Sequence, residues 1–470
     1  MAESTAYDLV VVGAGPGGYM AALRAAQLGF KTACVEKEPR PGGVCLNVGC
    51  IPSKALLDSS GHVLQARESF GDHGIRFDGL SFDLAAMMRR KEKVVSDLTD
   101  QVRKLLEGSG IEIVHGTASL SGPHAVSVAS ADRETRTLRA ERILLATGSA
   151  PIEVPGLSFD GRHIVDSTGA LSLDAVPEHL VVVGGGYIGL ELGSVWRRLG
   201  STVTVVEMLS GITATLDGQV RRALERALKK QGMRFHLNTK VSKAEVDGEK
   251  VGVTIEGKDG PATLECDRVL VAVGRRPLTA GLNLASVGVE TDEKTGHVRV
   301  DSRYRTRVES IYAIGDLIAG PALAHKASAE GIAAVENMAG LPGEVNYDTL
   351  PSVVYTWPEV AGVGLTEEAA RERKIPYRTG TYPFLGSGRA LCMGETTGFV
   401  KVISHSRTDR ILGIHIFGPH AAEMIAEGAL AMEFGAGSED LVRTVHAHPT
   451  LAEALQEAAR AARKKDGSAA

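Results

Sequence analysis

Two cysteines five positions apart, Cys45 and Cys50, are the residues in this sequence best suited to chemistry. On a straight helix their Cα atoms would lie roughly 8–9 Å apart, beyond the ~7 Å that a disulfide tolerates. Gly49 and Pro52 permit or force a distortion of such a helix, which brings a strained and easily reduced bridge within reach. Because so short a loop removes little entropy from the unfolded chain, redox exchange explains the pair better than structural stabilisation.

Two other interpretations of this cysteine pair stay open. The thiols could be buried and inert, or they could form half of a metal site, although no second cysteine pair accompanies them. The other three cysteines, Cys34, Cys266 and Cys392, lack such neighbours, and we expect them to be small core residues. Five cysteines in 470 residues make no secreted disulfide framework, which favours a reducing compartment.

A second chemical candidate lies near the C-terminus, in the stretch His446-Ala447-His448-Pro449-Thr450-Leu451-Ala452-Glu453. A histidine can accept a thiol proton and then hold the thiolate by charge, while a carboxylate orients its ring. We expect Pro449 to start a helix, which would place Glu453 in its early turns. Alone, such a histidine is more often a capping or packing residue, and the His-x-His pair would also suit a weak metal site.

The elements that must position these residues include a strand, turn and helix that occur twice. Strands are predicted at 8–12 and 180–183, each followed by a G-x-G-x-x-G turn and a helix; the glycines are Gly13, Gly15 and Gly18, then Gly184, Gly186 and Gly189. Such a turn lets the backbone approach a pyrophosphate at a helix N-terminus. One match alone would be weak evidence, but two matched copies predict two dinucleotide sites.

An acidic residue ends the next predicted strand of each copy, Glu36 in the first and Glu207 in the second. A carboxylate at this position accepts hydrogen bonds from a ribose hydroxyl. Glu207 would also repel the extra phosphate of NADP, and no arginine follows before Arg221, which favours NAD. The alternative is a surface glutamate at a strand end.

Composition places the chain among globular proteins. Hydrophobic residues make up 43% and charged residues 23%, close to average values. The formal charge of −5 comes with no basic block, so nucleic acid is not an expected partner, and no long apolar run predicts a membrane span. After about Asn346 the pattern changes to alternating strands and then helices, which indicates an α+β module.

These residues together resemble the disulfide-reductase branch of the FAD-dependent pyridine nucleotide oxidoreductases over essentially the whole chain. The resemblance is carried by the two glycine motifs, the stretch from Cys45 to Lys54, Gly315-Asp316 and the stretch from His446 to Glu453. It implies an α/β fold with two Rossmann-like dinucleotide-binding domains and a C-terminal α+β dimerisation domain. The implied domains are an FAD-binding domain at 1–149, an NAD-binding domain at 150–275, a central domain at 276–345 and a dimerisation domain at 346–470.

The resemblance also implies roles for single residues. Cys50 would face the flavin and Cys45 would meet the substrate, while His448 would act as acid–base catalyst with Glu453 as its partner. Lys54 and Glu191 would form an ion pair beside the flavin's reactive nitrogen. The remaining implied contacts with FAD and NAD are Gly13, Gly15, Gly18, Glu36, Gly116, Thr147, Gly148, Gly184, Gly186, Gly189, Glu207, Gly274, Asp316, Leu323, Ala324 and His325. No metal site is implied.

The implied activity is a flavoprotein disulfide oxidoreductase that oxidises protein-bound dihydrolipoamide to lipoamide and reduces NAD. Implied partners are a lipoylated domain of a 2-oxo acid dehydrogenase or glycine cleavage complex, and a second copy of the chain that lends each active site its histidine motif. The expected compartment is the cytoplasm, or the mitochondrial matrix if a targeting peptide was removed. Two alternatives stay open: an NADPH-dependent reductase of a small peptide disulfide, and a flavin-bearing assembly subunit of a larger complex.

Overall fold

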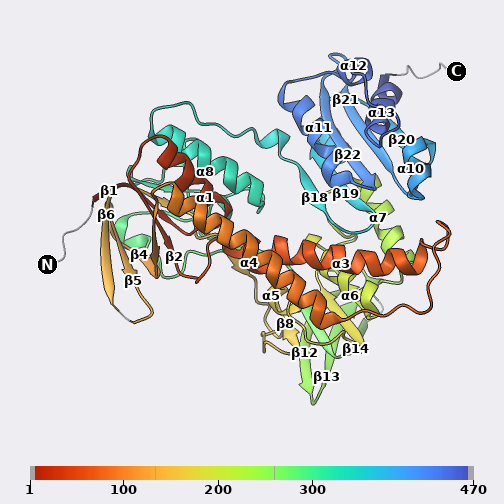
Figure 1. Ribbon diagram of the computed structural model, residues 1–470, viewed down its shortest axis with the longest axis horizontal. Helices are drawn as coiled ribbons and strands as arrows, with labels where there is room; N and C mark the ends of the chain where they lie inside the picture. The colour runs from red at the N-terminus through yellow and green to blue at the C-terminus, as the bar shows by residue number, and fades with distance from the viewer. Residues whose placement is uncertain (1–5, 133, 259, 464–470) are drawn as a thin grey trace. The chain divides into compact units, whose positions relative to one another are not determined.

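The computed structural model describes residues 6–132, 134–258 and 260–463 (Figure 1). The chain divides into two units, each with its own internal contacts. The first unit comprises Met1–Ala55, Ala86–Ile152 and Gly274–Val345, and the second comprises Leu56–Ala85, Glu153–Val273 and Asn346–Ala470. The four-domain division with its exact limits stays a prediction.

The first unit is built on one mostly parallel sheet. Its strands are β1 (Ala6–Val12), β2 (Thr32–Glu36), β3 (Glu112–His115), β4 (Thr117–Gly122), β5 (Ala125–Ala129), β6 (Thr135–Leu145) and β17 (Ile311–Ala313). They follow the order β3-β2-β1-β6-β5-β4, with β17 also paired to β6. From Leu9 to Val12, β1 is buried on both faces, which explains its continuous aliphatic run.

Two helices of this unit, α1 (Pro16–Gln27) and α8 (Ala324–Met338), lie side by side (Figure 1). Their backbones approach closely, because a Cβ on Gly331 would lie only 2.4 Å from the carbonyl oxygen of Gly17. An ion pair of 2.7 Å between Arg24 and Glu336 joins the same two helices. We call the glycine turns at 13–18 and 184–189 the first and second nucleotide turns. Three further helices follow α1 and β2 along the chain: α2 (Gly43–Val48), α3 (Cys50–Glu68) and α4 (Leu84–Gly108).

The second unit contains a parallel sheet that repeats the beginning of the first. Its strands are β8 (Ile164–Val165), β9 (His179–Val183), β10 (Thr202–Val206), β11 (Arg234–His236) and β15 (Arg268–Val271), in the order β11-β10-β9-β15-β8. Helices α5 (Ser167–Ala170), α6 (Tyr187–Leu199) and α7 (Gly218–Lys230) accompany it, and β12 (Lys240–Asp247), β13 (Lys250–Gly257) and β14 (Gly260–Cys266) form a separate antiparallel sheet. The succession β9-α6-β10 matches β1-α1-β2, which confirms the predicted internal duplication.

The C-terminal part of the second unit is an antiparallel sheet with helices, as predicted. Its strands are β18 (Ser352–Val354), β19 (Glu359–Gly364), β20 (Tyr377–Pro383), β21 (Phe399–His405) and β22 (Ile411–Gly418), in the order β18-β19-β22-β21-β20. The helices are α9 (Glu367–Glu372), α10 (Gly388–Met393), α11 (Ala421–Glu433), α12 (Ser438–Arg443) and α13 (Glu453–Arg463). No helix within the described ranges has the length and apolar character needed to cross a bilayer.

The isolated cysteines only partly follow the prediction of core positions. Cys34 and Cys266 are buried, as expected. Cys392 is exposed, so that prediction was wrong. It lies on the short helix α10, which turns only Ala390 into the core and leaves Leu391 and Cys392 facing solvent.

The close contact between α1 and α8 gives a stability test. Gly331→Ala should lower the free energy of unfolding by about 1–3 kcal/mol, because the new methyl group overlaps the Gly17 carbonyl. Gly61→Ala is the matched control within a helix, since its methyl group meets nothing closer than an Arg198 nitrogen at 4.0 Å. Urea denaturation should show this control as neutral or more stable; equal losses in both variants would contradict the packing argument.

Candidate active site

The carboxyl ends of the parallel strands in the first unit bring several predicted residues to one edge. Val12 of β1 pairs with Val35 of β2 and Leu145 of β6, and Leu145 pairs with Ala313 of β17. Since β3 also pairs with β2, the residues at or just beyond the ends of these strands share this edge: Gly13, Glu36, Gly116, Thr147, Gly148 and Asp316. The peptide N–H of Gly116 donates to the carbonyl of Glu36 at 3.0 Å, which ties two of them directly.

In each nucleotide motif, the first and third glycines are required by backbone packing. A Cβ on Gly13 would lie 2.5 Å from the carbonyl oxygen of Ala146, and one on Gly18 would lie 1.8 Å from that of Gly13. In the second copy, the corresponding distances are 2.5 Å from Gly184 to Ala272 and 2.3 Å from Gly189 to Gly184. No side chain fits at these positions while each helix begins so close to its strand.

The second glycine of each motif has no such packing reason. Gly15 and Gly186 have φ values of −68° and −80°, which any residue adopts. A Cβ on Gly186 would meet no described atom within 4 Å, and one on Gly15 would meet only Gly43 Cα at 3.9 Å. An open position at a helix N-terminus, with no side chain, fits the close approach of a cofactor pyrophosphate. The two turns thus have the shape that dinucleotides require.

Glu36 and Glu207 make the same contacts in the two copies. Glu36 accepts hydrogen bonds from the peptide N–H groups of Ala14 and Glu38, both at 2.9 Å. Glu207 accepts from those of Gly185 at 2.6 Å and Leu209 at 2.7 Å. Each carboxylate lies against its glycine turn, and each oxygen keeps a second lone pair for a ribose hydroxyl.

Asp316 is held by Ser149, which Arg275 holds in turn, and the sequence analysis identified neither of these two residues. Ser149 donates its hydroxyl to Asp316 Oδ2 at 2.5 Å, and Arg275 donates to the Ser149 hydroxyl and carbonyl oxygens at 2.7 and 2.6 Å. The pairing of β7 (Ser149–Pro151) with β16 (Arg275–Pro277) brings these residues together. No local pattern connects positions so far apart in the sequence.

A buried ion pair on α8 holds the neighbouring glycine, Gly315. Lys326 and Glu330 lie 3.0 Å apart with both side chains fully buried. Lys326 donates to the Gly315 carbonyl at 2.9 Å, and Glu330 accepts the Gly315 N–H at 2.8 Å. Their i,i+4 spacing is typical of surface pairs, so only the surrounding alanine and glycine residues could have indicated burial.

The other predicted cofactor contacts lie at element ends. Leu323 caps α8 in an extended conformation, and Ala324 and His325 open that helix. The Thr147 hydroxyl donates to the carbonyl of Leu278 at 2.8 Å. Gly274, three residues beyond β15, has a φ of +134°, where a side chain would be strained.

The predicted helix distortion between the two cysteines is confirmed. Helix α2 ends at Val48 and α3 begins at Cys50, with Gly49 between them at φ −136° and ψ −110°. A Cβ on Gly49 would lie 2.8 Å from the carbonyl oxygen of Val44, so the break depends on a glycine. The N-terminus of α2 contacts the first nucleotide turn, because Gly42 donates its N–H to Ala14 at 2.7 Å.

Cys45 and Cys50 are both thiols here, and their side chains form a hydrogen bond. That hydrogen bond, together with burial, raises the pKa of Cys45 far above its usual value, while the charge of Lys54 opposes the shift. Burial and the nearby Cys45 also raise the pKa of Tyr19 on α1. A thiol kept protonated in this way needs a base before it can act as a nucleophile.

His448 and Glu453 form the expected pair. His448 Nδ1 lies 2.8 Å from Glu453 Oε1, and Glu453 Oε2 accepts the N–H of Thr450 at 2.8 Å. The hydrogen bond from Thr450 and, to a smaller extent, that from His448 lower the pKa of Glu453, which keeps its carboxylate an ionised acceptor. Nδ1 therefore carries the proton and Nε2 is free to act as a base. The His448 side chain is 80% exposed.

One prediction for this motif, the start of its helix, was wrong. We expected a helix from Pro449, but α13 begins at Glu453. Residues 447–452 instead form an irregular, bent segment, in which the Thr450 hydroxyl donates to the Ala447 carbonyl at 2.8 Å. Glu453 is the first residue of α13, and its carboxylate accepts the N–H of Thr450 in the preceding segment.

The other histidine of the pair is structural. The His446 side chain is only 5% exposed, and its Nε2 lies 2.7 Å from Glu427. Among the described residues, no cluster of three histidine, cysteine, aspartate or glutamate side chains is suited to a metal ion. The structure thus offers no support for a His-x-His metal site.

Glu191 and Lys54 belong to different units, so their pairing stays a prediction. Glu191 is buried on α6 and accepts the N–H of Tyr355 at 2.9 Å. Lys54 lies in the first turns of α3, close enough to Cys45 for its charge to act on that thiol.

Comparisons with known proteins identify related sequences and folds. Residues 7–331 match the family described as pyridine nucleotide-disulphide oxidoreductase, and residues 350–459 match its dimerisation domain. The chain is 49% identical to a mitochondrial dihydrolipoyl dehydrogenase of Pisum sativum, over 97% of this chain and 91% of that protein. It is also 49% identical to a leghemoglobin reductase of Glycine max, over 98% and 88%. The solved structure of LpdA from Mycobacterium tuberculosis is similar at a TM-score of 0.90 and 28% identity, covering 97% of this chain and 99% of that one.

The contrast between the second and third glycines of a motif can be tested. Gly186→Ala should leave the unfolding midpoint unchanged but weaken NADH binding by about tenfold, because its methyl group points only into the space for the pyrophosphate. Gly189→Ala should cost about 1–3 kcal/mol of stability, because its methyl group overlaps Gly184. Fluorescence titration and urea denaturation measure the two effects. Wild-type NADH affinity in Gly186→Ala would argue against a nucleotide at this turn.

Proposed function

Because this chain belongs to the pyridine nucleotide-disulphide oxidoreductases, flavoproteins that use FAD and NAD(H), we propose that it oxidises dihydrolipoamide and reduces NAD. The observation that carries the proposal is the thiol pair Cys45 and Cys50, of which Cys45 lies on α2, the helix that starts against the first nucleotide turn. Relatives named dihydrolipoyl dehydrogenase, 48–50% identical over nearly the whole chain, support this substrate.

Cys45 and Cys50 exchange electrons with the substrate as a disulfide that opens. A substrate thiolate attacks Cys45, the Cys45–Cys50 bond breaks, and a mixed disulfide forms between the substrate and Cys45. The second substrate thiolate then displaces Cys45, which closes the lipoamide ring and leaves both cysteines as reduced sulfurs. When bound, FAD would supply the two-electron chemistry between these sulfurs and the nicotinamide. The residues that would hold FAD are the first glycine turn, Glu36 and Asp316.

His448 removes the thiol protons in this scheme. Its Nε2 is the free base, and Glu453 stabilises the imidazolium that forms. Both residues lie within the matched dimerisation domain, and His448 is mostly exposed on its own chain. A catalytic base on an open surface suits a homodimer in which each active site takes its histidine from the other subunit.

The proposed partner is a lipoylated domain of a 2-oxo acid dehydrogenase or glycine cleavage complex, because such domains carry the dithiol on a tethered arm. Several relatives are named mitochondrial, and the low cysteine content suits a reducing compartment, either the cytoplasm or a mitochondrial matrix.

Turnover of the purified enzyme tests the proposal. Anaerobic mixing of the FAD-loaded enzyme with dihydrolipoamide and NAD should produce NADH, and Cys45→Ser should abolish it, because no disulfide can then form. Cys392→Ser is the matched control and should keep wild-type turnover, since Cys392 lies exposed on α10. Failure of the wild-type enzyme to form NADH would refute the assignment.

His448→Gln should lower kcat by roughly 10²–10⁴-fold, because a general base supplies about that factor. Subunit mixing then asks where the histidine acts. Random dimers of His448→Gln with Cys50→Ser chains should regain about a quarter of wild-type activity, since half of the dimers hold one complete site. Activity that stays at the level of the parent variants would mean that each site is built within one chain.

NAD preference should depend on the carboxylate of Glu207. Glu207→Gln keeps an acceptor for ribose but removes the charge, so kcat/KM with NADP should rise by about tenfold. Glu36→Gln is the control, because that residue makes the equivalent contacts at the other turn. An unchanged ratio of NAD to NADP in Glu207→Gln would show that other residues set the preference.

A further inference from the structure

The loop from Glu207 to Asp217, between β10 and α7, forms one wall of the second nucleotide turn. Thr213 donates its N–H to the carbonyl of Gly185 at 2.9 Å, and Ile212 is fully buried against the same glycine. The hydroxyls of Tyr187 and Thr215 lie 2.8 Å apart and join the loop to the first turn of α6. The conformation of this loop therefore sets the position of Gly185.

The loop ends at a buried carboxylate, that of Asp217. Asp217 has no exposed surface, and its Oδ1 accepts the N–H of Gln219 at 3.0 Å, which caps α7. Lys401 on β21 donates to both carboxylate oxygens, at 3.0 and 2.9 Å. A charge this deeply buried is stable only with a partner, and Lys401 is that partner.

Lys401 also holds a second carboxylate, that of Glu367 at the start of α9. Its ammonium lies 2.7 Å from Glu367 Oε2, and this hydrogen bond lowers the pKa of Glu367. The Glu367 N–H in turn donates to Asp217 at 3.1 Å. His415, paired with Lys401 across β21 and β22, adds no second cation because burial lowers its pKa. One ammonium thus separates two carboxylates that would otherwise repel each other.

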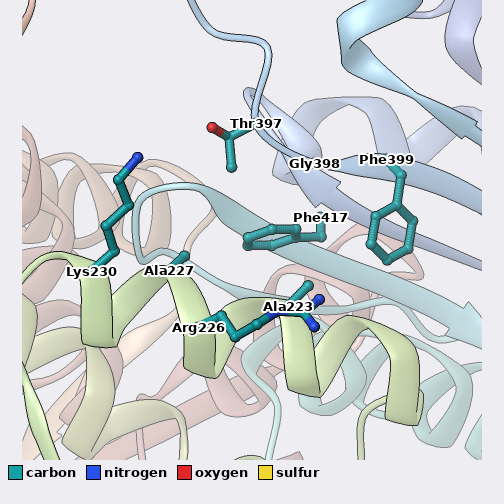
Figure 2. A pocket seen from close by; sticks show the side chains of 8 residues that line it. All are labelled: Ala223, Arg226, Ala227, Lys230, Thr397, Gly398, Phe399 and Phe417. Atoms are coloured by element: carbon teal, nitrogen blue, oxygen red, sulfur yellow. The ribbon is translucent and has the colours of Figure 1, made fainter.

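Beyond this cluster, packing between α7 and the C-terminal sheet is incomplete. A groove of about 320 Å³ lies there, lined by Ala223, Arg226, Ala227, Lys230, Thr397, Gly398, Phe399 and Phe417 (Figure 2). The rings of Phe399 and Phe417 come from the sheet and face a helix that offers two alanines and two cations. The charged cluster lies at the N-terminus of α7, where Asp217 caps the helix.

We propose that Lys401 is a positioning residue for the nicotinamide-nucleotide site, an inference that rests on the proposed NAD-dependent function. Through Asp217 it fixes the end of the loop whose middle contacts Gly185. Lys401 lies within the matched dimerisation domain, outside the nucleotide-binding domain that it would serve. The C-terminal domain would then shape NAD binding within its own chain.

Lys401→Met in the FAD-loaded enzyme tests this role. The buried Asp217 carboxylate, left without its cation, should move the loop and raise the dissociation constant of NADH by roughly ten- to a hundredfold, while KM for dihydrolipoamide and the FAD content stay unchanged. Lys401→Arg should restore most of the affinity. Arg378→Met is the matched control, since it removes a cation bound to Asp409 at 3.0 Å elsewhere in the same sheet and should leave NADH affinity unchanged.

If Lys401→Met does not fold, Asp217→Asn answers the question, because asparagine keeps the helix cap but loses the charge. Its NADH affinity should also fall; unchanged affinity in a folded variant of either kind overturns the proposal, as does an equal loss of NADH and dihydrolipoamide binding. Fluorescence titration of NADH separates this result from the proposed function. A wild-type enzyme that binds no NADH refutes that function, whereas tight binding that survives the loss of Lys401 refutes only the positioning role.

Discussion

Contact between backbone atoms at the nucleotide turns is the constraint on which the site depends. Helix α1 can begin so close to β1 only because residue 18 is a glycine. A Cβ at this position would lie 1.8 Å from the carbonyl oxygen of Gly13. With α1 so placed, Gly42 hydrogen-bonds to the turn, and α2 carries Cys45 to the same strand edge. The location of Cys45 therefore begins with contacts between backbone atoms, and the Asn47 side chain adds hydrogen bonds to the carbonyls of Pro41 and Gly43.

Buried charged side chains also hold parts of the backbone near the nucleotide turns. Gly315 is bound through its N–H and its carbonyl by the pair of Glu330 and Lys326, and the loop at Gly185 ends at a carboxylate held by Lys401. A buried ion pair contributes to stability only when hydrogen bonds satisfy its remaining polar atoms. Here peptide groups provide those hydrogen bonds: the N–H and carbonyl of Gly315 for one pair, and the N–H groups of Gln219 and Glu367 for Asp217.

The sequence predicted those structural features that residues close together in the chain determine. Strand, turn and helix around each glycine motif are local, and the break at Gly49 followed from the distance between two helical positions. The helix start at Pro449 was wrong: α13 begins at Glu453, whose carboxylate accepts the N–H of Thr450, a contact that favours a helix start beyond Pro449. The hydrogen bond from Ser149 to Asp316 joins positions 167 residues apart; the Gly315-Asp316 motif marked Asp316, but no local pattern marks Ser149 as its partner.

The first unit draws on three separate stretches of chain, and this has a consequence for biosynthesis. Strand β17 pairs with β6, and α8 lies against α1, so the edge near Asp316 needs residues made long after β1 leaves the ribosome. Residues 153–273 are synthesised in between and contain a complete parallel sheet. During translation, the parallel sheet within residues 153–273 can therefore form first. The sheet that begins with β1 can be completed only after β17 and α8 have been synthesised.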